Sequence, residues 1–144
     1  MASGFQQAAS AAFLLGIAAT VFAATPLDGK AAVCPALWQK NLPRLQDDSP
    51  QNLCQYSGKV ALVVNTASYC GFTTQYQGLE NVYARFQQRG LVVMGFPSND
   101  FGQQEPGNSK QIADLCFNTY GVKFPMFAKS VVTGVQANPL FKEL

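Results

Sequence analysis

The chain has 144 residues, of which 48% are hydrophobic and 12% are charged, and this is the size and composition of one globular domain. A net charge of +2, with no run of basic residues, argues against a nucleic-acid partner. The sequence contains no histidine, which excludes imidazole metal ligands and any Ser/His or Cys/His catalytic pair. Cysteine is therefore the leading candidate for chemistry.

The first predicted element is an export signal. Residues 8–24 form an uninterrupted run of apolar and small side chains, long for the hydrophobic region of a signal peptide and short for a membrane span. Val21 and Ala23 supply the side chains expected before a cleavage site. We expect a signal peptide at 1–23, export to the periplasm or outside the cell, and no membrane attachment after cleavage. Residues 1–7 contain no Lys or Arg, so an uncleaved membrane anchor is the alternative.

Four cysteines, Cys34, Cys54, Cys70 and Cys116, occur singly, without a Cys-x-x-Cys pair. This spacing argues against a zinc site and against a thioredoxin-type dithiol, so we expect no metal. In an oxidising compartment, unpaired thiols tend to be joined. Cys34 and Cys54 bracket a proline-rich, charged stretch, and we predict a structural disulfide there, contributing about 3 kcal/mol by restricting the unfolded chain. Two free, buried cysteines are the alternative.

The next segments alternate between strand and helix patterns. The apolar, β-branched run at 60–65 is typical of a central parallel strand. Residues 74–89 carry apolar side chains at spacings of three and four, which predicts a helix, and Gly90 is suited to its C-terminal cap. Residues 91–96 form a second buried-strand pattern that ends at Pro97.

The C-terminal part continues this alternation. Asn108 and Ser109 are suited to cap a helix that ends near Gly121. Residues 124–127 and 131–132 predict a third strand region, and residues 139–144 predict the first turns of another helix. The order strand, helix, strand, helix, strand indicates an α/β fold with right-handed parallel crossovers.

Cys70 lies in the predicted loop between the strand at 60–65 and the helix at 74–89. The free N–H groups and the dipole of a helix N-terminus favour a thiolate there, and Gly71 leaves the approach open. Cys70 is therefore a candidate nucleophile towards a peroxide bond. From position alone, a packed and inert cysteine is the equal alternative.

Four segments resemble the glutathione peroxidase family. They read NTASYCGFT at 65–73, FPSNDFGQQEP at 96–106, GVKFPMF at 121–127 and NPL at 138–140, in the family's order. The resemblance runs from about Gly58 to the end of the chain. It implies an N-terminal extension at 24–55 and a domain at 56–144 with a thioredoxin-like fold, an α/β sheet flanked by helices.

The resemblance also implies a function and its residues. Cys70 matches the peroxidatic position and would reduce hydrogen peroxide or an organic hydroperoxide, becoming a sulfenic acid. Gln104 matches the catalytic glutamine, whose amide would hydrogen-bond the sulfur and orient the peroxide. No prosthetic cofactor is implied. The co-substrate is a thiol reductant, either a thioredoxin-like protein or glutathione.

Cys116 matches the resolving cysteine of many non-selenium family members, which condenses with the sulfenic acid to form a disulfide. A dithiol protein would then be the expected reductant. The helix pattern places Cys116 on an apolar face with Ile112 and Leu115, so a small core residue is the alternative.

The chain departs from the family pattern at two places. Ser98 and Asp100 stand where Cys and Gln are common, so position 98 cannot resolve the sulfenic acid. The family's Trp-Asn-Phe motif, and the strands and helix after it, would lie beyond Leu144, so we expect an incomplete domain from a longer protein. The only tryptophan, Trp38, does not match that motif, and we expect it to pack the N-terminal extension onto the domain.

A second hypothesis from a different class is a non-catalytic redox sensor. Its oxidised Cys70 would pass the oxidation to a partner by disulfide exchange. Slow turnover with prompt formation of a mixed disulfide would favour the sensor over the peroxidase. The sequence gives no prediction of oligomeric state.

Overall fold

The structure is a computed structural model that describes residues 33–144. The predicted signal peptide at 1–23 and the first part of the predicted extension lie outside the described residues. Between residues 33 and 144, no helix is long and apolar enough to cross a membrane.

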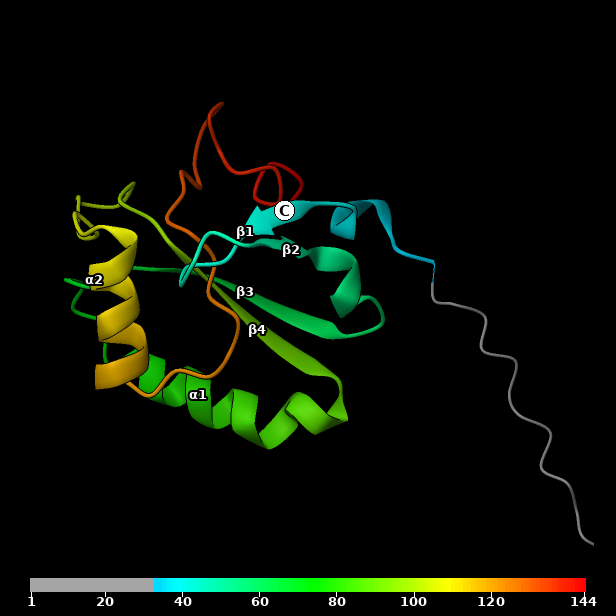
Figure 1. Cartoon of the computed structure of the whole chain (residues 1–144), viewed down its shortest axis with the longest axis horizontal. Coiled ribbons are helices and arrows are strands. Elements are labelled where there is room, and N and C mark those ends of the chain that lie inside the picture. Colours follow the sequence, from blue (N-terminus) through cyan, green and yellow to red (C-terminus); the bar gives the residue numbers. More distant parts are fainter. Residues whose placement is uncertain (1–32) are drawn as a thin grey trace, which may run out of the picture.

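From β3 to η4 the described elements alternate as strand, helix, strand and helix, as the sequence predicts for an α/β fold (Figure 1). The strands are β1 (Asn41–Pro43), β2 (Pro50–Asn52), β3 (Val60–Thr66) and β4 (Leu91–Pro97). The helices are α1 (Gln75–Phe86) and α2 (Ser109–Ala113), and α2 continues into a π-helical stretch, η4 (Asp114–Thr119). Short 3-10 turns are η1 (Ala36–Trp38), η2 (Leu53–Tyr56) and η3 (Gln87–Arg89).

Strands β3 and β4 form the parallel core of the fold, in register from Val60 opposite Leu91 to Thr66 opposite Pro97. On its other side, β4 receives the segment around Met126 through a parallel bridge at Gly95. The Gly95 amide donates to the Pro125 carbonyl at 2.9 Å. Strand β4 is therefore the central strand among the described residues.

The sequence predicted that residues 60–65 form a central strand, and in the described part of the chain this strand has a neighbour on one side only. Strand β3 pairs with β4 alone there, and its Val60 and Leu62 side chains are exposed. The apolar run at 60–65 and the run at 91–96 read alike. Which one becomes central depends on where the distant 125–127 segment docks, and that segment docks on β4.

Two apolar clusters cover the opposite faces of β4. The side chains of Val92, Met94 and Phe96 join a cluster with the N-terminal hairpin, which β1 and β2 form. The side chain of Val93 joins a cluster with α1 and the α2–η4 helix. This follows from the period of two along a strand. Figure 1 shows the same layering, with α1 on one side of β3 and β4, and β1 and β2 on the other.

The N-terminal hairpin is fastened to the domain. Strands β1 and β2 pair antiparallel, and the Leu45 amide donates to the Met126 carbonyl at 3.0 Å. Trp38 is buried in the cluster that also holds Phe96 and Leu140, as predicted for an anchor of this segment. A disulfide joins Cys34 to Cys54, with 5.3 Å between their Cα atoms, so the predicted bond is present.

Two predicted elements differ from the structure. Residues 124–127 do not form a regular strand, because Met126 bridges Gly95 of β4 while Phe127 bridges Arg44, the residue after β1. Residues 131–132 lie in a loop. Residues 139–144 form turns instead of a regular helix. Pro139 has no N–H to donate, and the Asn138 side chain accepts from the Leu140 amide at 2.9 Å, which closes a local turn.

Candidate active site

Cys70 lies between the end of β3 and the start of α1, as the strand and helix patterns predicted. The residue is half-buried, and its thiol is free. The Phe72 amide donates to Cys70 Sγ at 3.4 Å. One backbone donor is therefore already directed at the sulfur, where it would stabilise negative charge.

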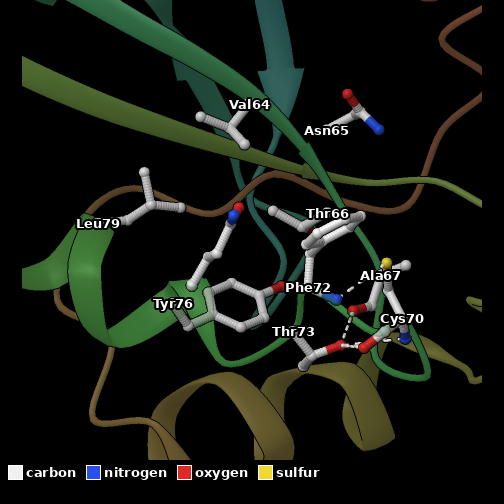
Figure 2. A pocket seen from close by; sticks show the side chains of 10 residues that line it. Val64, Asn65, Thr66, Ala67, Cys70, Phe72, Thr73, Tyr76 and Leu79 are labelled. Atoms are coloured by element: carbon white, nitrogen blue, oxygen red, sulfur yellow. Dashed lines mark hydrogen bonds between the residues drawn. The ribbon is translucent and has the colours of Figure 1, made fainter.

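Thr73 fixes the shape of the loop that carries Cys70 (Figure 2). Its hydroxyl accepts from the Cys70 amide at 3.0 Å and lies within hydrogen-bond distance of three carbonyl oxygens, those of Ala67, Ser68 and Cys70. A hydroxyl has one proton to donate, so these carbonyls share it. The Thr73 amide closes the turn by donating to the Cys70 carbonyl at 3.0 Å.

A small cavity of about 70 Å³ opens beside Cys70 between β3 and α1. Figure 2 shows the side chains around it. The lining is mainly apolar, with a few hydroxyl and amide groups, and comes from Val64, Asn65, Thr66, Ala67, Cys70, Phe72, Thr73, Gln75, Tyr76 and Leu79. It is large enough for a peroxide group and too small for a whole lipid chain.

The rim of the site carries exposed aromatic side chains. Tyr69 is 73% exposed and Phe72 is 71% exposed, and they are close to Cys70 on either side in the sequence. The surface around the thiol is therefore apolar, although large apolar side chains are usually withdrawn from water.

Gln104 comes close to the Cys70 loop through its backbone. Its carbonyl accepts from the Tyr69 amide at 3.0 Å, which ties the loop after β4 to the loop after β3. The side chain is half-buried and does not line the cavity beside Cys70. In the described part of the chain, no hydrogen bond joins the Gln104 amide to the thiol.

Ser98 and Asp100 have structural partners. Ser98 is buried, and its amide donates to the Thr66 carbonyl at 3.0 Å. Asp100 Oδ2 accepts from the Val132 amide at 2.7 Å and from the Thr133 amide at 2.9 Å. These hydrogen bonds, the one from Val132 first, hold the pKa of Asp100 below its ordinary value. Asp100 thus fastens the loop that carries Gln104 to residues 132–133.

Cys116 lies in the π-helical stretch and is fully buried, on the apolar face that the sequence predicted. Its Sγ donates to the Tyr76 hydroxyl at 3.4 Å. Burial raises the pKa of the Cys116 thiol to about 11, with a further rise from Glu105 and an opposing effect of the Tyr76 hydrogen bond. The thiol is therefore protonated and unreactive in this position.

The sequence did not predict the environment of Glu105. This carboxylic acid follows Gln104 directly, is 0% exposed, and has no partner of normal hydrogen-bond geometry on either oxygen. Burial raises the pKa of Glu105, while the nearby hydroxyl and amide of Ser68 and the charge of Lys129 oppose the rise. A glutamate within a polar loop reads as solvated, and only packing reveals that this one is buried.

No group of three or more His, Cys, Asp or Glu side chains suited to a metal ion occurs in residues 33–144. The described site holds a half-buried thiol beside a cavity.

Comparison with known proteins gives a consistent result. The sequence model of the family described as glutathione peroxidase matches residues 40–144. The chain is 58% identical over 98 residues to "Hydroperoxy fatty acid reductase gpx1" of Synechocystis sp., covering 68% of this chain and 58% of that protein. It is 48% identical over 102 residues to "Glutathione peroxidase-like peroxiredoxin gpx1" of Schizosaccharomyces pombe, covering 71% of this chain and 65% of that protein. The chain thus spans about three fifths of the length of these relatives.

Solved structures also resemble this fold. The crystal structure described as Trgpx in apo form has a TM-score of 0.56 and 39% identity, covering 76% of this chain and 63% of that one. The crystal structure of T. cruzi GPX1 has a TM-score of 0.54 and 25% identity, covering 75% of this chain and 63% of that one.

Proposed function

This chain belongs to the glutathione peroxidase family, and on that premise we propose that it acts as a thiol peroxidase through Cys70. The observation that carries the proposal is the position of this thiol. It lies between a strand end and a helix start, next to a small cavity, with the Phe72 amide directed at its sulfur. The other free cysteine of residues 33–144, Cys116, is fully buried.

In the first step, the Cys70 thiolate attacks the terminal oxygen of a hydroperoxide. An S–O bond forms and the O–O bond breaks, so the sulfur is oxidised by two electrons and the peroxide is reduced to an alcohol or water. The leaving oxygen takes up a proton. Gln104 is proposed to orient the peroxide with its amide. The backbone of Gln104 is tied to the Cys70 loop through the Tyr69 amide, and this role requires its side chain to turn towards the sulfur.

In the second step, Cys116 is proposed to resolve the sulfenic acid. Its sulfur bonds to Cys70 Sγ, the S–O bond breaks, and water leaves with the thiol proton. A dithiol protein of the thioredoxin type would then reduce the disulfide, with glutathione as the alternative reductant. Because Cys116 is buried, this step requires its helix to open locally.

An organic hydroperoxide is the proposed preferred substrate. The exposed rings of Tyr69 and Phe72 offer an apolar surface beside a cavity that admits only the peroxide group. The Synechocystis relative bears the name of a hydroperoxy fatty acid reductase. Replacement of Phe72 by Ala is expected to lower kcat/KM for a fatty-acid hydroperoxide more than for hydrogen peroxide. An equal loss for both substrates would contradict this preference.

The proposed location is outside the cytoplasm. The apolar run at 8–24 and a disulfide between Cys34 and Cys54 both fit an exported protein, since disulfides persist mainly in oxidising compartments. Sequencing the N-terminus of the protein recovered from its native cells tests this. A start near Thr25 or Ala24 supports cleavage after 1–23, and an intact Met1 or Ala2 would support the uncleaved anchor.

The experiment that tests the function treats the reduced chain with one equivalent of hydroperoxide and maps each cysteine by mass spectrometry. Wild type is expected to form a Cys70–Cys116 disulfide, and Cys116→Ser is expected to stop at a sulfenic or sulfinic Cys70. Cys70→Ser is the matched control and should consume no peroxide. Oxidation of Cys70 no faster than free cysteine would refute the peroxidase. Prompt mixed disulfides with a partner but slow turnover would favour the redox sensor.

A further inference from the structure

Tyr76 connects the two free cysteines of the described chain. It lies in the first turn of α1, shortly after Cys70, and its side chain is 2% exposed. The same side chain lines the cavity beside Cys70 and accepts a hydrogen bond from Cys116 Sγ at 3.4 Å. Figure 2 shows its ring directed from α1 towards the loop of Thr73 and Cys70. One buried residue therefore faces both the proposed nucleophile and the proposed resolving thiol.

The segment that holds Cys116 is an unusual helix. Residues 114–119 are π-helical, directly after the short helix α2, and the Tyr120 amide donates to the Leu115 carbonyl at 3.2 Å. Such wide turns are rare, and they occur often at functional sites. Opening of a short, irregular helix costs less than opening of the core strands.

Tyr76 contacts this segment at two points. Besides its hydrogen bond with Cys116, its ring packs against Tyr120 with 5.4 Å between the ring centroids. Any opening that exposes Cys116 must break the first contact, and it strains the second. Burial raises the pKa of both the Cys116 thiol and the Tyr76 hydroxyl, so both groups keep their protons and the thiol can donate to the hydroxyl.

We propose that Tyr76 is a positioning residue that holds Cys116 in its buried place and thereby limits the rate at which the Cys70–Cys116 disulfide forms. The inference rests on the proposed function for the meaning of that disulfide. Tyr76 forms no covalent bond and exchanges no electrons in this step. Because Tyr76 lies in the first turn of α1, next to the Cys70 loop, a rearrangement of that loop would move Tyr76 before the rest of the helix.

The hydroxyl of Tyr76 can be removed with little other change. Tyr76→Phe keeps the ring and its packing, and it removes the acceptor of the hydrogen bond from the Cys116 thiol. The exposure of Cys116 is then expected to rise about two- to ten-fold, as for the loss of one ordinary hydrogen bond from the closed state. Tyr120→Phe is the matched control, because it removes a hydroxyl from the same cluster that makes no hydrogen bond with Cys116.

The first measurement needs no peroxide. The whole reduced chain is alkylated at pH 7, and the rates at Cys116 and Cys70 are followed by mass spectrometry. We expect the rate of alkylation of Cys116, taken relative to that of Cys70 in the same protein, to be about two- to ten-fold higher in Tyr76→Phe and unchanged in Tyr120→Phe. An unchanged rate at Cys116 would overturn the inference. An equal rise in Tyr120→Phe would indicate general loosening of the cluster and would overturn it too.

The second measurement follows disulfide formation after one equivalent of hydroperoxide. Because Tyr76 also lines the cavity beside Cys70, the rate of Cys70 oxidation is measured in each protein, and disulfide formation is compared with it. Relative to Cys70 oxidation, Tyr76→Phe is expected to form the Cys70–Cys116 disulfide faster by a similar factor. Normal oxidation of Cys70 with an unchanged disulfide rate would overturn the inference alone. If Cys70 is not oxidised even in wild type, the proposed function fails, and the alkylation rates still decide whether Tyr76 holds Cys116.

Discussion

The loop around Cys70 depends on one hydroxyl, and its removal gives the sharpest test of the site. In Thr73→Val, the side chain keeps its shape but can neither accept from the Cys70 amide nor donate to the carbonyls of Ala67, Ser68 and Cys70. Because a hydroxyl donates one proton at a time, about two hydrogen bonds are lost in total.

At about 0.5–1.5 kcal/mol for each hydrogen bond, the expected loss of unfolding free energy is about 1–3 kcal/mol. Thr73 is only half-buried, and water can replace part of what is lost, so a value near the lower end, about 1–2 kcal/mol, is expected. The Cys70 amide would also lose its fixed orientation. We therefore expect slower oxidation of Cys70 by peroxide as well.

The assay is urea unfolding of both proteins, together with the rate of Cys70 oxidation under a limiting amount of peroxide. Thr74→Val is the matched control, because Thr74 is exposed and its side chain does not cap α1. It is expected to leave both quantities unchanged. A Thr73→Val protein within about 0.5 kcal/mol of wild type, with an unchanged oxidation rate, would refute the role given to this hydroxyl.

Three further predictions concern the framework. Replacing Cys34 and Cys54 by Ser is expected to lower the unfolding free energy by about 3 kcal/mol, measured by urea unfolding without reductant. Reductant should then destabilise wild type and not the variant. An equal loss of unfolding free energy in both proteins on adding reductant would contradict this prediction. Gly95→Ala places a methyl group on the buried Met126 sulfur and is expected to cost about 1–3 kcal/mol, whereas an undisturbed melting temperature would refute that close approach. The third prediction concerns Glu105. Burial raises the pKa of this carboxyl above its ordinary value of 4.5, because the folded state disfavours the charged form. The unfolding free energy therefore falls as the pH rises from 4.5 through the pKa of the folded state. Glu105→Gln should remove this loss, so its unfolding free energy relative to wild type should increase with pH in urea titrations, and a pH-independent difference would refute the assignment.

Much of the fold was predictable from local patterns. The runs at 60–65 and 91–96 became β3 and β4, and the helical spacing at 74–89 became α1 and η3. Local sequence also predicted where Cys70 lies, because the residue falls between a strand pattern and a helix pattern. These features depend on side-chain periodicity over neighbouring residues, and a single sequence contains that information directly.

Other features could not be read in this way. The strands β3 and β4 are both apolar, and in the described part of the chain β4 has neighbours on both sides because residues 125–127 dock at Gly95. The burial of Glu105 could not be predicted either, because this residue lies in a polar loop. The contact between Tyr76 and Cys116 joins residues that are far apart in the chain. Local periodicity does not encode which distant segments meet. Which distant segments meet depends on how the apolar faces of the described elements pack together. The same packing buries the Cys116 thiol and raises its pKa, so that it keeps its proton.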